Sequence, residues 1–302
     1  LRKIDFYVWW YNLFDEQKIN QALRSFNNLI QNEQPFETYL QIANDYFNVG
    51  LLNEAEQVLA ICPANTLVKY WLAYIHAKQN KTFTADLAAA NSAAPDFVFP
   101  FRNMDFDVFE WATKQSSHWK PKYYLALLLK DRNKVAQSKA IFTSLQGEPD
   151  YAPFYATRAA LLMTETTQAS ALTATIADLN KAILLDKNQW RYIKTLTELY
   201  NNQFAFMKAL EVVAPYYKAH TDNYIIGMLY AKTLIHNKQY KTADKLLATL
   251  NIIPFEGATI GHELYREAKL MQALVQLQEK NYTAALNFIN EAKLWPENLG
   301  AG

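Results

Sequence analysis

The sequence predicts an all-α fold, a right-handed α-solenoid of about eight stacked helix pairs. Glycine supplies only 7 of the 302 residues, well below its usual share of about 7%, and this scarcity favours helices joined by short turns over strands. Apolar residues make up 51% and aromatic residues 14% of the chain, so a large core can be buried. Seven segments also place small and apolar residues at one fixed spacing, which is the signature of an internal repeat.

The clearest repeat unit begins at Tyr39. Ile42 and Ala43 are followed by Tyr46, and Ala55 comes nine residues later. This order matches the tetratricopeptide pattern, in which a small residue on each of two helices lets them cross at close range. The small residue of the second helix recurs at Ala22, Ala85, Ser138, Ala209, Ala243 and Ala285.

The sequence also indicates where the second helices end and where the repeat is interrupted. Prolines at 63, 95, 149, 215, 254 and 296 are expected to end second helices, because proline disrupts a helix interior. An irregular unit is expected over 151–190, with 164–175 as a lengthened turn. Two inserts break the period: 97–118, which has room for an additional helix near 105–114, and 251–262, a longer loop. Inserts of this kind often carry function, so both are candidate binding segments.

No composition change marks a domain boundary, so residues 1–302 are expected to form a single solenoid. The start at Leu1 without a methionine, and the end at a Gly-Ala-Gly tail, suggest a fragment of a longer multidomain chain. The compartment stays open between cytoplasm and periplasm, because a targeting signal would lie outside such a fragment.

A chain of distinctive blocks carries a resemblance to a known family. SHWKPKYYLALL, PDYAPFYATRA, LDKNQWR, LYREAKLMQA and AKLWPENLGAG occur in this order. They resemble the tetratricopeptide region of large bacterial multidomain proteins, common in Bacteroidetes, that carry a domain of unknown function ahead of the repeats. The resemblance covers nearly all of 36–302. It implies a β-sandwich-like preceding domain and, as an alternative function, an accessory region of a carbohydrate-active or carbohydrate-binding parent protein.

Several other classes of function are disfavoured. Lys and Arg (30) balance Asp and Glu (29), with no basic run, so a nucleic-acid partner is not expected. The longest apolar run, 6–14, is too short for membrane insertion. His262 and Glu263 lack the second histidine of a zinc-protease motif, whose place Arg266 takes, and no phosphate-binding loop occurs. We therefore expect no metal, no cofactor and no catalytic centre, so the chain is not an enzyme.

Two conspicuous features have plain structural interpretations. The single cysteine, Cys62, is expected to be a buried small residue at the end of a second helix and chemically inert. Asp105, Asp107 and Glu110 could supply a glycosidase-like acid pair, but acids near a helix start also offset the helix dipole, and we favour that interpretation.

The predicted function is a non-catalytic interaction scaffold that binds a partner protein or peptide along a concave face formed by the first helices. The partner could also be the preceding domain of the same chain. Arg158 and Arg191 could either bridge adjacent units or form an anion-binding row with Arg102. The residues expected to line the binding face are Asn44, Tyr70, Tyr74, Lys120, Tyr123, Arg158, Arg191, Lys194, Glu198, Asn201, Asn202, Lys232 and His236.

Overall fold

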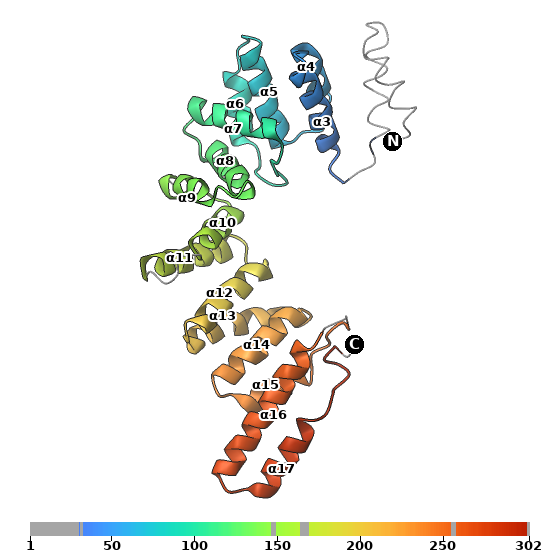
Figure 1. Cartoon of the computed structure of the whole chain (residues 1–302), viewed down its shortest axis with the longest axis vertical. Helices are drawn as coiled ribbons and strands as arrows, with labels where there is room; N and C mark the ends of the chain where they lie inside the picture. The colour runs from blue at the N-terminus through green and yellow to red at the C-terminus, as the bar shows by residue number, and fades with distance from the viewer. Residues whose placement is uncertain (1–29, 31–32, 146–148, 164–168, 255–257, 301–302) are drawn as a thin grey trace. The chain divides into compact units, whose positions relative to one another are not determined.

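The structure is a computed structural model that describes residues 30, 33–145, 149–163, 169–254 and 258–300. Fifteen helices, α3 to α17, follow one another in these ranges (Figure 1). The chain divides into two compact units, Leu1–Pro149 and Asp150–Gly302. The degenerate first repeat with Ala22 lies outside the described residues. No helix in the described part of the chain combines the length and the apolar character needed to cross a membrane.

The described residues of the first unit form three helix pairs and one extra helix. The pairs are α3 (Pro35–Asn48) with α4 (Leu52–Ala60), α5 (Thr66–Lys78) with α6 (Thr84–Ser92), and α8 (Trp119–Asp131) with α9 (Val135–Ser144). The extra helix, α7 (Asn103–Gln115), packs on both α5 and α8. The additional helix predicted near 105–114 is thus confirmed.

Four helix pairs make up the part of the second unit that the structure describes. They are α10 (Ala152–Leu162) with α11 (Ala169–Leu185), α12 (Trp190–Asn202) with α13 (Phe206–Ala219), α14 (Tyr224–His236) with α15 (Tyr240–Leu247), and α16 (Ile260–Gln278) with α17 (Tyr282–Glu291). Helix α12 contacts α11, helix α14 contacts α12 and α13, and helix α16 contacts α14 and α15. The prediction of an all-α solenoid of tetratricopeptide-like helix pairs is confirmed.

The small residues of the repeat lie where the two helices of a pair cross. In the pair α8–α9 the hydroxyl of Ser138 donates a hydrogen bond of 2.7 Å to the carbonyl of Ala126, so the two helices touch at these positions. A bulky side chain at these positions would force the helices apart, which explains the spacing seen in the sequence. The buried small residues are Ala43, Ala55, Ala73, Ala126, Ser138, Thr197, Ala209, Ala231, Ala243, Ala273 and Ala285.

One repeat register was wrong. In α6 the residues that face the core are Leu87 and Ala90, whereas Ala85 is exposed. The alanine-rich stretch offers several similar small residues, and the burial of Leu87, the large apolar residue of α6, decides which face turns inward. Asp86 then reaches His76 of α5, with 2.8 Å between Oδ2 and Nδ1.

Two expected helix boundaries also differ. Helix α13 does not end at Pro215 but continues to Ala219. The next two residues, Tyr216 and Tyr217, are buried, and the Tyr216 hydroxyl donates to the carbonyl of Asn188 at 2.8 Å. These contacts offset the hydrogen bond that proline cannot make. Helix α11 begins at Ala169, so residues 169–175 are helical rather than part of a turn, and 164–168 lie outside the described residues.

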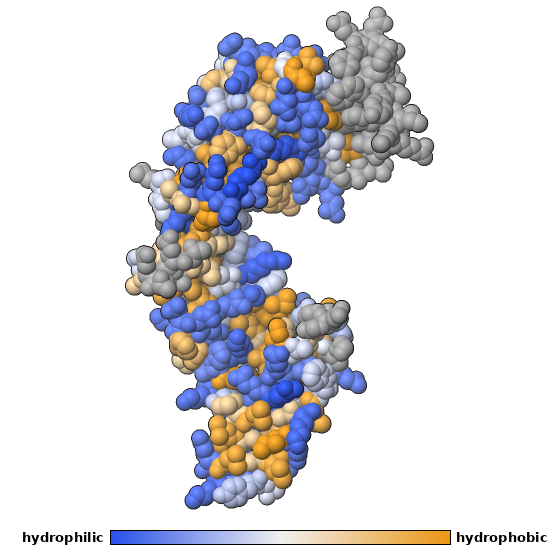
Figure 2. Space-filling view, viewed as in Figure 1, coloured by the Kyte–Doolittle hydropathy of each residue, from blue (hydrophilic) through white to orange (hydrophobic). Residues whose placement is uncertain are grey.

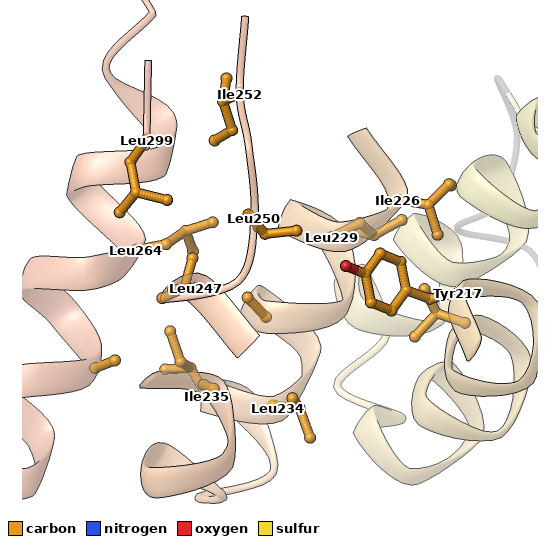
Figure 3. Close-up of a cluster of buried hydrophobic side chains, with 14 of the residues drawn as sticks. Tyr217, Ile226, Leu229, Leu234, Ile235, Leu247, Leu250, Ile252, Leu264 and Leu299 are labelled. Carbon is orange, nitrogen blue, oxygen red and sulfur yellow. The ribbon is translucent and has the colours of Figure 1, made fainter. Parts of the chain in front are cut away.

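The described part of the 251–262 insert is held in place by the C-terminal segment that contains Asn298 and Leu299. Ile252 and Leu299 form an isolated parallel bridge and both belong to the core of the second unit (Figure 3). The backbone N–H of Ile252 donates to the carbonyl of Asn298 at 2.9 Å. The Asn298 amide donates to the carbonyls of Leu247 and Leu250 at 3.0 and 2.7 Å. This part of the insert is therefore structural.

The same C-terminal segment covers a histidine. The rings of His262 and Trp295 stack with centroids 3.7 Å apart and planes 18° from parallel. His262 is buried, and its two ring nitrogens have no hydrogen-bond partner within the described ranges. Burial lowers the pKa of His262, and the charge of Arg266 lowers it further.

This burial predicts a loss of stability in acid. Since the folded pKa of His262 is lowered, its neutral form is favoured in the folded state, and the stability gained above pH about 6.5 is lost as the pH falls through the folded pKa. His262→Phe keeps a ring against Trp295 without a titrating group. Urea unfolding at pH 7.5 and 5.5 is expected to show a smaller acid-induced loss in the variant, whereas equal losses would contradict this origin.

Cys62 follows α4, which ends at Ala60, and its side chain is partly buried. Burial raises the pKa of the thiol to about 12, and the charge of Glu37 adds to the shift. The protonated thiol is a poor nucleophile at neutral pH. Cys62 is therefore partly buried rather than buried as expected, and its chemical inertness stays a prediction.

Candidate functional site

A groove of about 220 Å³ opens between the first helices of the second unit. Helix α12 supplies Lys194, Glu198, Asn201 and Asn202, helix α14 supplies Ile225, Met228, Leu229 and Lys232, and the start of α16 supplies Ile260 and Leu264. The spacing explains why these side chains gather. Residues three, four and seven apart lie on one helical face, and each helix contributes such a set.

The groove combines an apolar lining with polar groups. The apolar side chains come mainly from α14 and the start of α16. On α12, the Lys194 ammonium forms an ion pair with Glu198 one helical turn later, at 2.8 Å. Lys232 is exposed and forms no salt bridge with another described residue, so its ammonium is available to a ligand.

Asn201 is the most constrained polar group of the groove, with 7% of its surface exposed. Its Nδ2 donates a hydrogen bond to the Thr233 hydroxyl oxygen at 3.0 Å. The Thr233 hydroxyl in turn donates to the carbonyl of Leu229 at 2.8 Å. This chain of donors fixes the amide orientation. The Asn201 Oδ1 atom is then left without a partner among the described residues. An unpaired buried acceptor is costly, so an N–H group that reached this atom would be stabilising.

His236 lies one helical turn after Lys232 on α14. Burial lowers the pKa of His236, and the neighbouring Lys232 charge lowers it further, against an opposing effect of Glu267. The imidazole is therefore neutral at pH 7, and its ring packs against Phe206 with centroids 4.8 Å apart. His236 does not line the groove, whose two lysines are Lys194 and Lys232.

The structure brings Lys194, Glu198, Asn201, Asn202 and Lys232 together in this groove, as the repeat register suggests. Arg158 and Arg191 are placed elsewhere in the second unit. Arg158 binds Asp178 with two hydrogen bonds, from Nε at 2.8 Å and from Nη2 at 2.6 Å. The exposed Arg191 packs over the ring of Trp190 and donates to Gln189 at 3.3 Å.

Four of the residues nominated in the first unit are buried. The rings of Tyr70 and Phe109 lie 5.2 Å apart, and those of Tyr74 and Trp111 lie 5.5 Å apart. Phe109 and Trp111 belong to α7, so the extra helix covers the face of α5 that a regular stack would leave open.

Lys120 and Tyr123 are buried as well. The Lys120 ammonium donates to the carbonyl oxygens of Asn91, at 2.7 Å, and Ala93, and burial lowers its pKa. Tyr123 packs against Phe142 with ring centroids 5.9 Å apart. These side chains hold α8 to its neighbours and are not exposed groove residues. Asn44 of α3 is partly exposed.

Sequence reasoning missed the apolar part of the groove. Ile225, Met228 and Leu229 have the spacing of one helical face, and this signal could have been read. Ile260 and Leu264 had no such signal, because they reach the groove only through the fold of the 251–262 insert. Across the described ranges, no three histidine, cysteine or acidic side chains are placed to hold a metal ion.

Comparison with known proteins yields solved structures but no family assignment. No family model and no curated protein matches the sequence. A tetratricopeptide repeat protein from Parabacteroides merdae is 12% identical over 87% of this chain and 95% of its own, with a TM-score of 0.38. The C-terminal part of a TPR repeat-containing protein from Cytophaga hutchinsonii is 13% identical over 86% and 97%, with a TM-score of 0.45. YrrB, a TPR protein with an unusual peptide-binding site, is 13% identical over 61% and 90%, with a TM-score of 0.45.

Proposed function

We propose that this chain is a non-catalytic scaffold that binds an extended peptide segment of a partner protein in the groove between α12, α14 and α16. The Oδ1 acceptor of Asn201 carries the proposal, because it is buried without a partner among the described residues and belongs to a residue that lines the groove. A peptide backbone N–H satisfies this acceptor. The exposed Lys232 ammonium then donates to a peptide carbonyl or, more strongly, to a carboxylate.

The apolar lining selects for peptides that also carry an aliphatic side chain. Met228 and Leu229 of α14, with Leu264 of α16, offer a surface that such a side chain covers. Met is adaptable in shape, which suits recognition of several related sequences. We therefore infer a ligand with an extended backbone, one aliphatic residue and a nearby acidic group. No described residue favours the carbohydrate-related alternative.

The experiment selects a phage-displayed random peptide library on the full chain and measures the affinities of the enriched peptides by fluorescence polarisation. Lys232→Glu places a negative charge opposite the ligand's acid and is expected to weaken binding at least about tenfold. Asn201→Ala removes one acceptor and is expected to weaken it roughly five- to tenfold. Thermal unfolding checks that both variants remain folded.

Lys245→Glu is the matched control, because Lys245 is exposed on α15 and does not line the groove. This variant is expected to bind the peptides as the unchanged chain does. Failure of the chain to enrich any sequence would contradict the proposal. Equal weakening by the Lys232 and Lys245 substitutions would show that the peptides bind by net charge and not in the groove.

A further inference from the structure

One face of the first helices changes from charged to apolar along the second unit. The change is seen at two repeat positions, which lie three residues before and one residue after the small residue where paired helices cross. These positions hold Lys194 and Glu198 in α12, Met228 and Lys232 in α14, and Leu270 and Leu274 in α16. The side chains that α12 and α14 supply at these positions line the groove. The series therefore runs from an ion pair, through a mixed pair, to two leucines, which we call the leucine face of α16.

Helix α16 lies beside α14 in the same way as α14 lies beside α12. In the earlier neighbour pair, Asn202 of α12 and Ile225 of α14 line one groove. The equivalent residues of the next pair are His236 of α14 and Glu267 of α16. Burial lowers the pKa of His236 and the charge of Glu267 opposes this shift, so these two side chains also lie near each other. Because successive units of a repeat stack contact their neighbours alike, the leucine face continues the groove past α14.

The leucine face is open to a ligand and suits an uncharged one. Leu270 and Leu274 are each 44% exposed, and Figure 2 shows apolar residues gathered over this end of the second unit. Glu267, the acidic residue beside this face, is exposed and opposes a second carboxylate, whereas Lys232 on the preceding first helix attracts one. A ligand acid is therefore favoured at α14, and an aliphatic side chain is favoured at α16.

We propose that the peptide bound in the groove carries a second aliphatic residue, which packs on the leucine face of α16 beyond the acidic residue held by Lys232. This inference rests on the proposed peptide-binding function and names the part of the ligand that reaches α16. A peptide segment is the occupant indicated by the position of the leucine face. An extended chain that crosses α12 and then α14 reaches α16 next, because these first helices follow one another along the groove.

The geometry of the stack sets the spacing between the two ligand residues. Packed helices lie about 8–10 Å apart, and an extended peptide advances roughly 3.3 Å per residue. The step from α14 to α16 therefore corresponds to about three residues. The second aliphatic residue is expected at about this distance from the acidic residue, on the side away from the part of the peptide bound at Asn201.

A leucine scan of an enriched peptide tests this proposal. A single leucine is moved one position at a time away from the acidic residue, with alanine at the other positions, and binding to the full chain is measured by fluorescence polarisation. Leucine about three positions from the acid is expected to bind roughly five- to tenfold more tightly than the peptide with alanine throughout. Leu270→Ser and Leu274→Ser are each expected to reduce this gain while leaving the affinity for the alanine peptide nearly unchanged.

Leu286→Ser is the matched control, because Leu286 is an exposed leucine of the same helix pair but belongs to the second helix, α17. This variant is expected to bind every peptide as the unchanged chain does, and circular dichroism checks that all three variants remain folded. The scan on the unchanged chain is decisive by itself, because it requires no substitution in the protein.

Two results would overturn the inference and leave the proposed groove in place. They are the absence of a leucine gain at any position, and a gain that persists in both Leu270→Ser and Leu274→Ser, each in peptides that Lys232→Glu still weakens. Failure of the chain to bind any peptide would overturn both this inference and the proposed function.

Discussion

Replacing Asp105 with alanine is expected to lower the free energy of unfolding of the first unit by about 4 kcal/mol. Asp105 is fully buried, and its carboxylate accepts from the Trp71 indole at 2.7 Å and from the backbone N–H groups of Phe101 and Arg102 at 2.9 and 2.8 Å. Alanine leaves the Trp71 indole N–H and the Arg102 backbone N–H buried without an acceptor, and each orphaned buried donor costs about 1–3 kcal/mol. The part-buried N–H of Phe101 loses its acceptor as well. Denaturant unfolding monitored by tryptophan fluorescence measures the loss.

Asp107→Ala provides the control, because Asp107 lies on the same helix two residues later and is exposed. Its effect is expected to stay within about 0.5 kcal/mol. Asp105→Asn keeps one acceptor oxygen and should fall between the two variants. Similar stabilities for the Asp105→Ala and Asp107→Ala variants would show that the hydrogen bonds of Asp105 do not hold α7 in place.

Replacing Arg158 with alanine is expected to destabilise the second unit by about 3 kcal/mol, because it leaves the Asp178 carboxylate buried without its counter-charge. Asp178 has 7% of its side chain exposed and accepts two hydrogen bonds from the Arg158 guanidinium. The double variant Arg158→Met with Asp178→Leu removes both charges and keeps an apolar volume. It is expected to recover most of the lost stability.

This pair of variants also decides between the two interpretations of Arg158. If the arginine bridges α10 and α11, Arg158→Ala shifts the urea midpoint and the double variant restores it. If the arginine belongs to an anion-binding row, Arg158→Ala leaves the midpoint unchanged and weakens capture of acidic peptides, which the double variant does not restore. The bidentate contact with Asp178 leads us to expect the first result.

Much of the fold was predictable because the repeat is a local signal. The small residues that let two helices cross recur at a fixed interval, and their burial in the structure follows directly from that requirement. The wrong predictions concern a helix register and a helix end, which the spacing of residues along the chain does not determine. In α6 several alanines could have faced the core, and the burial of Leu87 selected the register. At Pro215, contacts made by Tyr216 outweighed the usual effect of proline.

The candidate site was predictable only where the stack is regular. Lys194, Asn201 and Lys232 meet in one groove because the first helices of the second unit follow one another in register. In the first unit the same rule nominated Tyr70 and Tyr74, but α7 covers them. Helix α7 was expected from the sequence, whereas its docking position depends on long-range packing that no local pattern encodes.

Amide hydrogen exchange of the full chain, with and without a peptide enriched from the displayed library, tests the peptide groove most directly. The segments Trp190–Asn202 and Tyr224–His236 are expected to gain protection on binding, because α12 and α14 supply most of the groove lining. The second helices α13 and α15 are expected to exchange as before. Protection confined to α13 and α15, or to the Leu1–Pro149 unit, would contradict the assignment of peptide binding to this groove.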